Sequence, residues 1–165
     1  NLVGKVTQEL EFSDEIKLRV ANEVLPTVRD FIIAAERRAG ESIADDYRVK
    51  VSVTGGWYVR QYEHEYNPVH VHVGCNLSCV GYLSLPDGID HEFATDEQDH
   101  YPCKGMLNFV YGTDSKFCTN QIMVKPRVGD FYLFPADLWH CVYPFSSIGE
   151  RRSFSMNFMA GRDWS

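Results

Sequence analysis

The first third of the chain has the hydrophobic periodicity of an α-helix. Ile16, Val20 and Val24 recur every four residues, and the apolar positions from Val28 onward follow an i, i+3, i+4, i+7 pattern. Pro26 stands between the two runs, where it can begin a helix but would break one from inside. The pattern therefore predicts two N-terminal helices divided at Pro26, with one long kinked helix as the alternative.

From residue 47 onward the pattern changes to short segments rich in apolar residues and separated by turn residues, as is typical of strands. Gly55 and Gly56 predict a turn between the first two of these segments. The predicted strands are Tyr47–Val53, Trp57–Tyr62, Val69–Val73, Ser78–Leu85, Met106–Tyr111, Gln121–Val124, Asp130–Phe134, Trp139–Val142 and Arg152–Met159.

Many short strands behind a helical lead-in indicate a mainly β protein with N-terminal helices, folded as a double-stranded β-helix, the cupin-like jelly roll. The length of 165 residues suits one domain with its own core. We therefore expect a single unit over residues 1–165, with a helical support region at 1–46 and a jelly-roll core at 47–165.

The chain is acidic, with 16 Lys and Arg against 23 Asp and Glu and a net charge of −7. This balance disfavours nucleic acid and anionic membrane as partners, because both attract basic surfaces. No apolar run is long enough to cross a bilayer. The five Cys residues are an odd number without a C-x-x-C pair, so we expect most of them to be small buried residues in a reducing, cytoplasmic compartment.

Residues 86–104 form a long segment that is rich in Asp and Glu. Loops of this length in compact domains are often mobile or functional. Two interpretations remain open: a solvated acidic loop, or a loop that covers the substrate and favours cationic partners.

Three histidines carry the strongest chemical signal. His70 and His72 stand at i and i+2 on a predicted strand, so their side chains point to the same face. His140 comes from a distant predicted strand, which a sandwich can bring close to the first two. Three imidazoles on one face suit iron, zinc, copper or nickel and leave coordination positions open for chemistry.

The last predicted strand alternates a polar face with a face that is apolar apart from Arg152. If the apolar face packs on the helices, the polar face lines the interior, where an Arg is unfavourable unless an anion pairs with it. A bound dicarboxylate would be such an anion, because a guanidinium grips a carboxylate with two parallel hydrogen bonds. A solvent-exposed strand is the alternative. The polar face consists of Arg151, Ser153, Ser155 and Asn157.

Five motifs follow one another in the β-rich part. They read VRQY at 59–62, YNPVHVH at 66–72, SCVGYL at 78–83, PRVGDFYLFP at 126–135 with LWH at 138–140, and ERRSFSMNF at 150–158. In this order they resemble the 2-oxoglutarate- and iron(II)-dependent oxygenases, especially the prolyl-hydroxylase-like branch with its bacterial and phage relatives. The resemblance covers about Trp57 to Phe158.

The resemblance implies roles for particular residues. His70 and His140 correspond to the iron ligands of the family, and Arg151 with Ser153 to the pair that holds the far carboxylate of 2-oxoglutarate. Further positions that it places against the cosubstrate are Tyr62, Tyr82 and, in phase with Arg151, Asn157.

His72 departs from the family pattern, because the H-x-D form of the motif has its carboxylate there. Either His72 is a third nitrogen ligand, which leaves the site one charge unit more positive, or it is a bystander and water fills its place. Asp137 is a conceivable substitute carboxylate, although its place in a turn favours a structural role.

The resemblance implies a dioxygenase that uses Fe(II), 2-oxoglutarate and dioxygen to hydroxylate a C–H bond of a small-molecule or peptide substrate, with a peptidyl proline as the suggested target. One rival is a three-His cupin-type dioxygenase that does not use 2-oxoglutarate; Arg151 would then be dispensable. The other is a non-catalytic jelly-roll module with structural zinc, for which a fourth ligand such as His64 would be needed.

Overall fold

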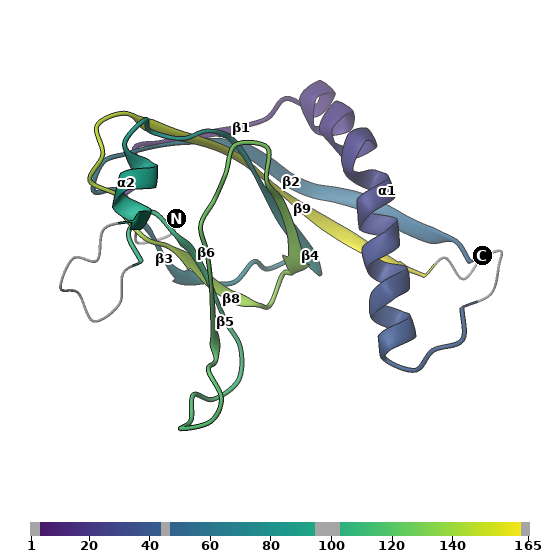
Figure 1. Ribbon diagram of the computed structural model, residues 1–165. Helices are drawn as coiled ribbons and strands as arrows, with labels where there is room; N and C mark the ends of the chain where they lie inside the picture. Colours follow the sequence, from purple (N-terminus) through teal and green to yellow (C-terminus); the bar gives the residue numbers. More distant parts are fainter. Residues whose placement is uncertain (1–3, 44–46, 95–102, 163–165) are drawn as a thin grey trace.

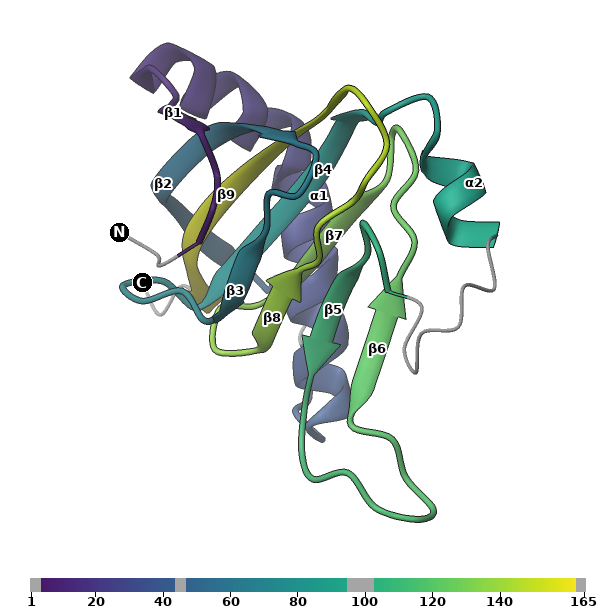
Figure 2. The same cartoon turned by 90° about the vertical axis from the view of Figure 1, so that its left-hand side faces the viewer.

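The computed structural model describes residues 4–43, 47–94 and 103–162, which form two facing antiparallel sheets and two helices (Figures 1 and 2). The larger sheet has the order β1-β2-β9-β4-β7, with β1 (Gln8–Glu11), β2 (Val49–Tyr62), β4 (Leu77–Ser84), β7 (Phe131–Pro135) and β9 (Glu150–Arg162). The smaller sheet has the order β3-β8-β5-β6, with β3 (Asn67–His70), β5 (Leu107–Val110), β6 (Gln121–Val124) and β8 (Trp139–Val142). The predicted mainly β jelly roll is confirmed.

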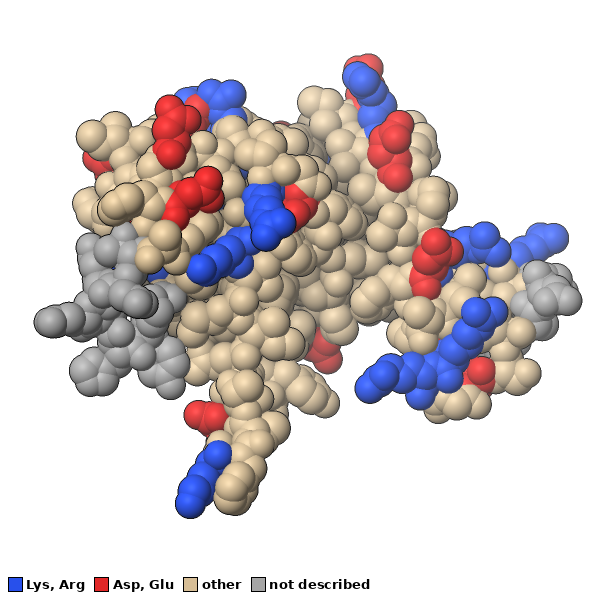
Figure 3. Space-filling view, viewed as in Figure 1, with Lys and Arg blue, Asp and Glu red and all other residues tan. Residues whose placement is uncertain are grey.

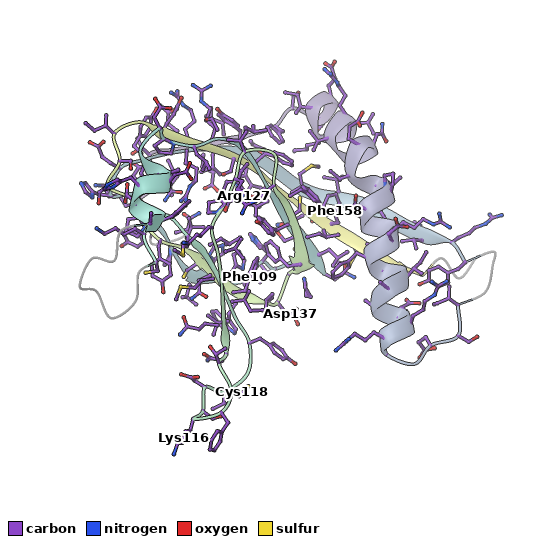
Figure 4. The ribbon with its side chains drawn as sticks, in the orientation of Figure 1. Phe109, Lys116, Cys118, Arg127, Asp137 and Phe158 are labelled. Carbon is purple, nitrogen blue, oxygen red and sulfur yellow. The ribbon has the colours of Figure 1, made fainter. Side chains whose placement is uncertain are left out.

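The central strand β9 separates the core from the interior of the jelly roll. Met156 and Phe158 are fully buried on its outer face, where they pack with Val28 and Ile32 of α1 (Asp14–Arg38). Figure 4 shows Phe158 beside this helix, and Figure 1 shows the helix lying against the larger sheet. The polar side chains on the opposite face of β9 therefore point toward the smaller sheet, as the alternating pattern predicts.

The prediction of two helices divided at Pro26 is wrong, because α1 runs unbroken from Asp14 to Arg38 with Pro26 inside it. Ser13 caps its start, accepting a hydrogen bond from the backbone of Ile16. A proline inside a helix costs about 3 kcal/mol. The apolar residues before and after Pro26 pack on the same sheet, so their common burial offsets this cost and keeps the helix continuous.

The predicted turn at Gly55 and Gly56 is also wrong. Both glycines lie within the continuous strand β2, which pairs with β9 along its whole length. The register shifts between Val53 and Gly55, as in a β-bulge, so the glycines bend the strand instead of reversing it. Gly56 is buried, and a Cβ there would already touch Phe12 and Met156.

Two elements were not predicted. The support region 1–46 contains the short strand β1, which pairs with β2 over Trp57–Arg60. The acidic segment 86–104 begins with the helix α2 (Ile89–Ala94), and the Glu92 carboxylate accepts hydrogen bonds from the backbone of Ser146 and Ser147. Residues 95–102, on which the proposed covering role also depends, lie outside the described residues.

A long connection between β5 and β6 projects away from the jelly roll, with Lys116 and Cys118 at its tip (Figure 4). Acidic and basic side chains are intermingled over the face shown in Figure 3. None of the five cysteines forms a disulfide, and two of them, Cys79 and Cys141, are buried. Neither helix in the described part of the chain is both long and apolar enough to cross a membrane.

The packing of Gly81 on β4 gives a test of the fold. A Cβ at Gly81 would overlap the ring of Phe154, so we expect Gly81→Ala to lower the free energy of unfolding by about 1–3 kcal/mol. Gly161 on β9 has open space around its Cα, so Gly161→Ala serves as the matched control and should change stability by less than about 0.5 kcal/mol. Urea denaturation measures both, and equal effects of the two substitutions would contradict the packing described.

Candidate metal and cosubstrate site

A pocket of about 600 Å³, including its open mouth, lies between the two sheets. Its walls come from strands of both sheets, and it is lined by all three histidines of the predicted site as well as by Arg151. The fold therefore brings the predicted chemistry together in one place.

His70, His72 and His140 form one compact group. One ring nitrogen from each lies within 4.8 Å of the others, and the ring centroids of His70 and His140 are 4.2 Å apart. His70 ends β3 and pairs directly with His140 on β8. His72 follows the end of β3, and its backbone N–H donates to the carbonyl of Ala136 at 2.8 Å, which holds it beside the other two.

Two backbone carbonyls orient two of the rings. Nδ1 of His70 lies 2.7 Å from the carbonyl oxygen of Pro68, and Nδ1 of His140 lies 2.8 Å from that of Leu138. Since a carbonyl oxygen only accepts, each Nδ1 is the donor, and in the neutral ring the free lone pair is then on Nε2. Hydrogen bonds of this kind fix the tautomer of metal-binding histidines.

Burial in the pocket keeps two of the three imidazoles neutral, those of His72 and His140. Burial lowers the pKa of His72 to about 4, with a further lowering from His70. Burial lowers the pKa of His140 to about 4 as well, although its hydrogen bond to Leu138 acts in the opposite direction. A neutral imidazole is the form that binds a metal, so two rings need lose no proton at neutral pH.

The donor set fits a catalytic metal better than a closed structural one. Three imidazole nitrogens converge, and no fourth His, Cys, Asp or Glu joins the group among the described residues. His64 lies in the turn after β2, is exposed and does not belong to it. Asp137 is exposed in the turn between β7 and β8 and does not belong to it either (Figure 4). Such a set leaves positions open for other ligands.

Arg151 is 2 % exposed, and no carboxylate pairs with it within the described ranges. Its Nη1 donates to the carbonyl of Gly105 at 2.8 Å and its Nη2 to Oε1 of Gln61 at 2.6 Å. The guanidinium carbon lies 5.5 Å from the centre of the Phe145 ring. Burial lowers the pKa of Arg151, the direction expected when a cation is removed from water without an anionic partner. An anion in the pocket would supply that partner.

The other residues assigned by resemblance divide into two groups. Ser153 and Tyr82 are buried and line the pocket with Arg151. Tyr62 does not line it; the guanidinium carbon of Arg60 lies 5.6 Å from its ring centre. Asn157 does not line it either; its Oδ1 accepts a hydrogen bond from the hydroxyl of Ser78 at 2.8 Å, and Ser78 also lies outside the pocket lining. The structure thus brings two of these four side chains to the site.

Several lining residues were missed in the sequence, among them Glu9, Trp57 and Gln61. The side chains of Trp57, Val59 and Gln61 lie on one face of β2, whereas that of Tyr62 lies on the opposite face. A two-residue repeat starting at Trp57 would have indicated this face. No local signal marks Glu9, because its short strand was not predicted.

Comparison with known proteins agrees with this geometry. Residues 55–157, more than half of the chain, match a family model described as "Putative 2OG-Fe(II) oxygenase". The chain belongs to this family. The match begins at the bulge of β2 and ends on β9, so it contains the histidine group and Arg151.

Two solved oxygenase structures, one from Streptomyces hygroscopicus and one from Pseudomonas putida, share the fold. HygX from Streptomyces hygroscopicus, with nickel and 2-oxoglutarate bound, is 12% identical with a TM-score of 0.57, covering 96% of this chain and 72% of its own. A Pseudomonas putida prolyl-4-hydroxylase is 14% identical with a TM-score of 0.53, covering 95% and 77%. A weaker match is an oxidoreductase of the 2OG-Fe(II) oxygenase family from Burkholderia pseudomallei, which is 13% identical with a TM-score of 0.49. This match covers 68% of the present chain but only 46% of the length of the Burkholderia protein. No curated protein matches the sequence.

Fe(II) and 2-oxoglutarate are the cofactor and cosubstrate of this oxygenase family. The predicted family, enzyme class and cofactors are therefore confirmed. The oxygenase described here has a compact three-His group where the H-x-D pattern would place two histidines and one carboxylate.

The depressed pKa values predict how stability depends on pH. Histidines of the unfolded chain titrate near pH 6.5, whereas His72 and His140 titrate near 4 in the folded protein. Between these values the unfolded chain binds more protons, so stability falls as the pH is lowered through this window. We expect the two residues to remove roughly 2–4 kcal/mol from the unfolding free energy of the metal-free oxygenase between pH 7 and 4.5.

Urea denaturation of metal-free protein at the two pH values measures this loss. The double variant His72→Ala/His140→Ala should show a distinctly flatter dependence on pH. A dependence as steep as that of the unmodified protein would show that other groups cause it.

Proposed function

We propose that this protein is a 2-oxoglutarate-dependent hydroxylase in which His70, His72 and His140 hold Fe(II) and Arg151 binds the far carboxylate of 2-oxoglutarate. The observation that carries the proposal is a buried guanidinium without a carboxylate partner among the described residues, in the same pocket as three converging imidazoles. Bound Fe(II) and 2-oxoglutarate supply the oxidising power that turns a C–H bond into C–OH with dioxygen, releasing succinate and carbon dioxide.

The protein's own residues prepare this site before any ligand arrives. The carbonyls of Pro68 and Leu138 aim two imidazoles, so little reorganisation is needed on metal binding. Gln61 and Gly105 hold the guanidinium of Arg151 in one orientation. This orientation reduces the entropy lost when a carboxylate is bound.

Ser153 and Tyr82 complete the proposed carboxylate pocket, because both line it beside Arg151. Burial raises the pKa of Tyr82, so its hydroxyl stays protonated and can donate to an anion. Apolar side chains, among them Leu107 and Phe134, form much of the remaining wall and limit the access of water. Exclusion of water strengthens each polar contact inside the pocket.

The substrate proposal is a C–H bond in a peptide or small molecule, with peptidyl proline as the first compound class to test. The proline is suggested by the prolyl-hydroxylase-like motifs of the sequence. Succinate formation with a proline-rich peptide, followed by a gain of one oxygen atom in the peptide mass, tests this choice. Succinate formation with other amine or amino-acid substrates alone would reject proline and keep the hydroxylase.

Arg151→Ala tests the cosubstrate site. Metal-free protein is mixed with Fe(II) and 2-oxoglutarate without oxygen, and the visible charge-transfer band of the chelate is titrated. We expect the variant to need roughly 100-fold more 2-oxoglutarate, because it loses a desolvated, charge-assisted contact. Arg152→Ala is the matched control, since the adjacent Arg152 is exposed and pairs with Glu150, and it should titrate as the unmodified protein does.

Each rival function gives a different result in this titration. A three-His dioxygenase without 2-oxoglutarate would bind iron but develop no band, and Arg151→Ala would not affect its oxygen uptake. A structural zinc module would bind zinc tightly and consume no oxygen with any cosubstrate.

His72→Ala tests the third ligand. If His72 binds the metal, its loss should weaken Fe(II) affinity by at least about 100-fold, because the effect should exceed that of losing an outer hydrogen bond. His72→Asp should largely restore binding, since carboxylate also suits iron. His64→Ala, in the exposed turn outside the group, is the control. Anaerobic competition with a coloured chelator measures the affinities, and an unchanged affinity in His72→Ala would identify His72 as a bystander.

A further inference from the structure

Glu9 gives the pocket a negative charge that the proposed chemistry does not use. It lies on β1 opposite Val59 and is exposed, yet its side chain lines the same pocket as the three histidines. Among the described residues that line this pocket, the charged side chains are Glu9 and Arg151. Since Arg151 is assigned to 2-oxoglutarate, Glu9 is the charge that a substrate would meet.

The carboxylate of Glu9 is available for a ligand. Within the described part of the chain, no ion pair or side-chain hydrogen bond engages it. Glu11, two residues along the same strand, pairs with Lys17 at 2.6 Å. The two glutamates project from the same side of β1. Glu11 is held by its ion pair with Lys17, whereas the carboxylate of Glu9 has no such partner in the described part of the chain.

Trp57 adds an aromatic surface to this part of the pocket. It is half-buried on β2, opposite Glu11 in the strand pairing, and its ring centroid lies 5.8 Å from that of His72. Glu9 and Trp57 both line the pocket, and Trp57 lies at the end that holds the histidines. A carboxylate with an indole face nearby is a combination that recognises organic cations.

We propose that Glu9 and Trp57 select a substrate that carries an ammonium or guanidinium group near the C–H bond to be hydroxylated; a proline peptide meets this requirement only with a basic group beside the proline. The inference rests on the proposed function, because that function assigns the other charge of the pocket to 2-oxoglutarate. Glu9 is a specificity-determining residue in this scheme: it acts on the substrate's charge and leaves metal and cosubstrate binding unchanged.

The test uses n-butylammonium and its neutral analogue 1-butanol as probes. The protein is loaded with Mn(II) and 2-oxoglutarate, and the metal-induced relaxation of the probe protons is titrated by NMR. We expect n-butylammonium to bind about fivefold or more tightly than 1-butanol, the size expected of an exposed ion pair with an aromatic contact. Glu9→Gln should abolish the preference, and Glu9→Asp should restore part of it.

Glu11→Gln is the matched control, because it removes a carboxylate from the same strand that is already paired with Lys17. It should keep the preference for the cation. Equal binding of the two probes to the unmodified protein, or a preference that survives Glu9→Gln, would overturn the proposal.

The Fe(II) and 2-oxoglutarate band, recorded on the same variants, separates this inference from the proposed function. A normal band without a Glu9-dependent preference rejects the substrate proposal alone. A Glu9-dependent preference without any band rejects the use of 2-oxoglutarate and keeps cation recognition. If no metal binds, saturation transfer from the protein to the probes provides the same comparison.

Discussion

The strand β9 lies inside the larger sheet, between β2 and β4, and both of its faces are covered. One face packs against the core, and the other lines the pocket. Met156 and Phe158 on one face contribute to the core under α1, and Arg151 and Ser153 on the other face line the pocket. A shift of one residue in register would exchange these faces. The buried apolar contacts of the core thus determine that the guanidinium points inward, so the stability of the fold and the position of the site depend on the same strand.

Burial of Arg151 without a carboxylate partner in the described structure is unfavourable unless other groups compensate. Gln61 and the carbonyl of Gly105 supply hydrogen bonds but no charge. Gln61 in turn donates to the backbone carbonyl of Glu65 at 2.5 Å, which keeps its amide oxygen directed at the arginine. This arrangement presents a buried cation to the pocket, and it is the basis for the proposal that a dicarboxylate binds there.

Burial depresses the pKa values of His72 and His140, so these two imidazoles carry no charge at neutral pH. Compared with the H-x-D pattern, a metal held there keeps one more positive charge. Glu9 contributes a nearby negative charge without belonging to the histidine group. The pocket therefore has a negative rim and a positive interior, an arrangement that can separate a cationic substrate from an anionic cosubstrate.

Sequence patterns with a short period were sufficient for much of this protein. They predicted the β-rich jelly roll, the approximate bounds of most strands, and the histidines and arginine of the candidate site. Strand alternation and motif spacing are local properties, which is why the sequence alone contains them. Tertiary contacts decided the rest. Pro26 stays within one helix because residues on both sides of it pack on one sheet. The pairing of β2 with β9 decides which face of β2 lines the pocket, so Gln61 lies there and Tyr62 does not. Glu9 reaches the pocket only through the pairing of β1 with β2. These outcomes depend on contacts between residues far apart in the chain, which a local pattern does not encode.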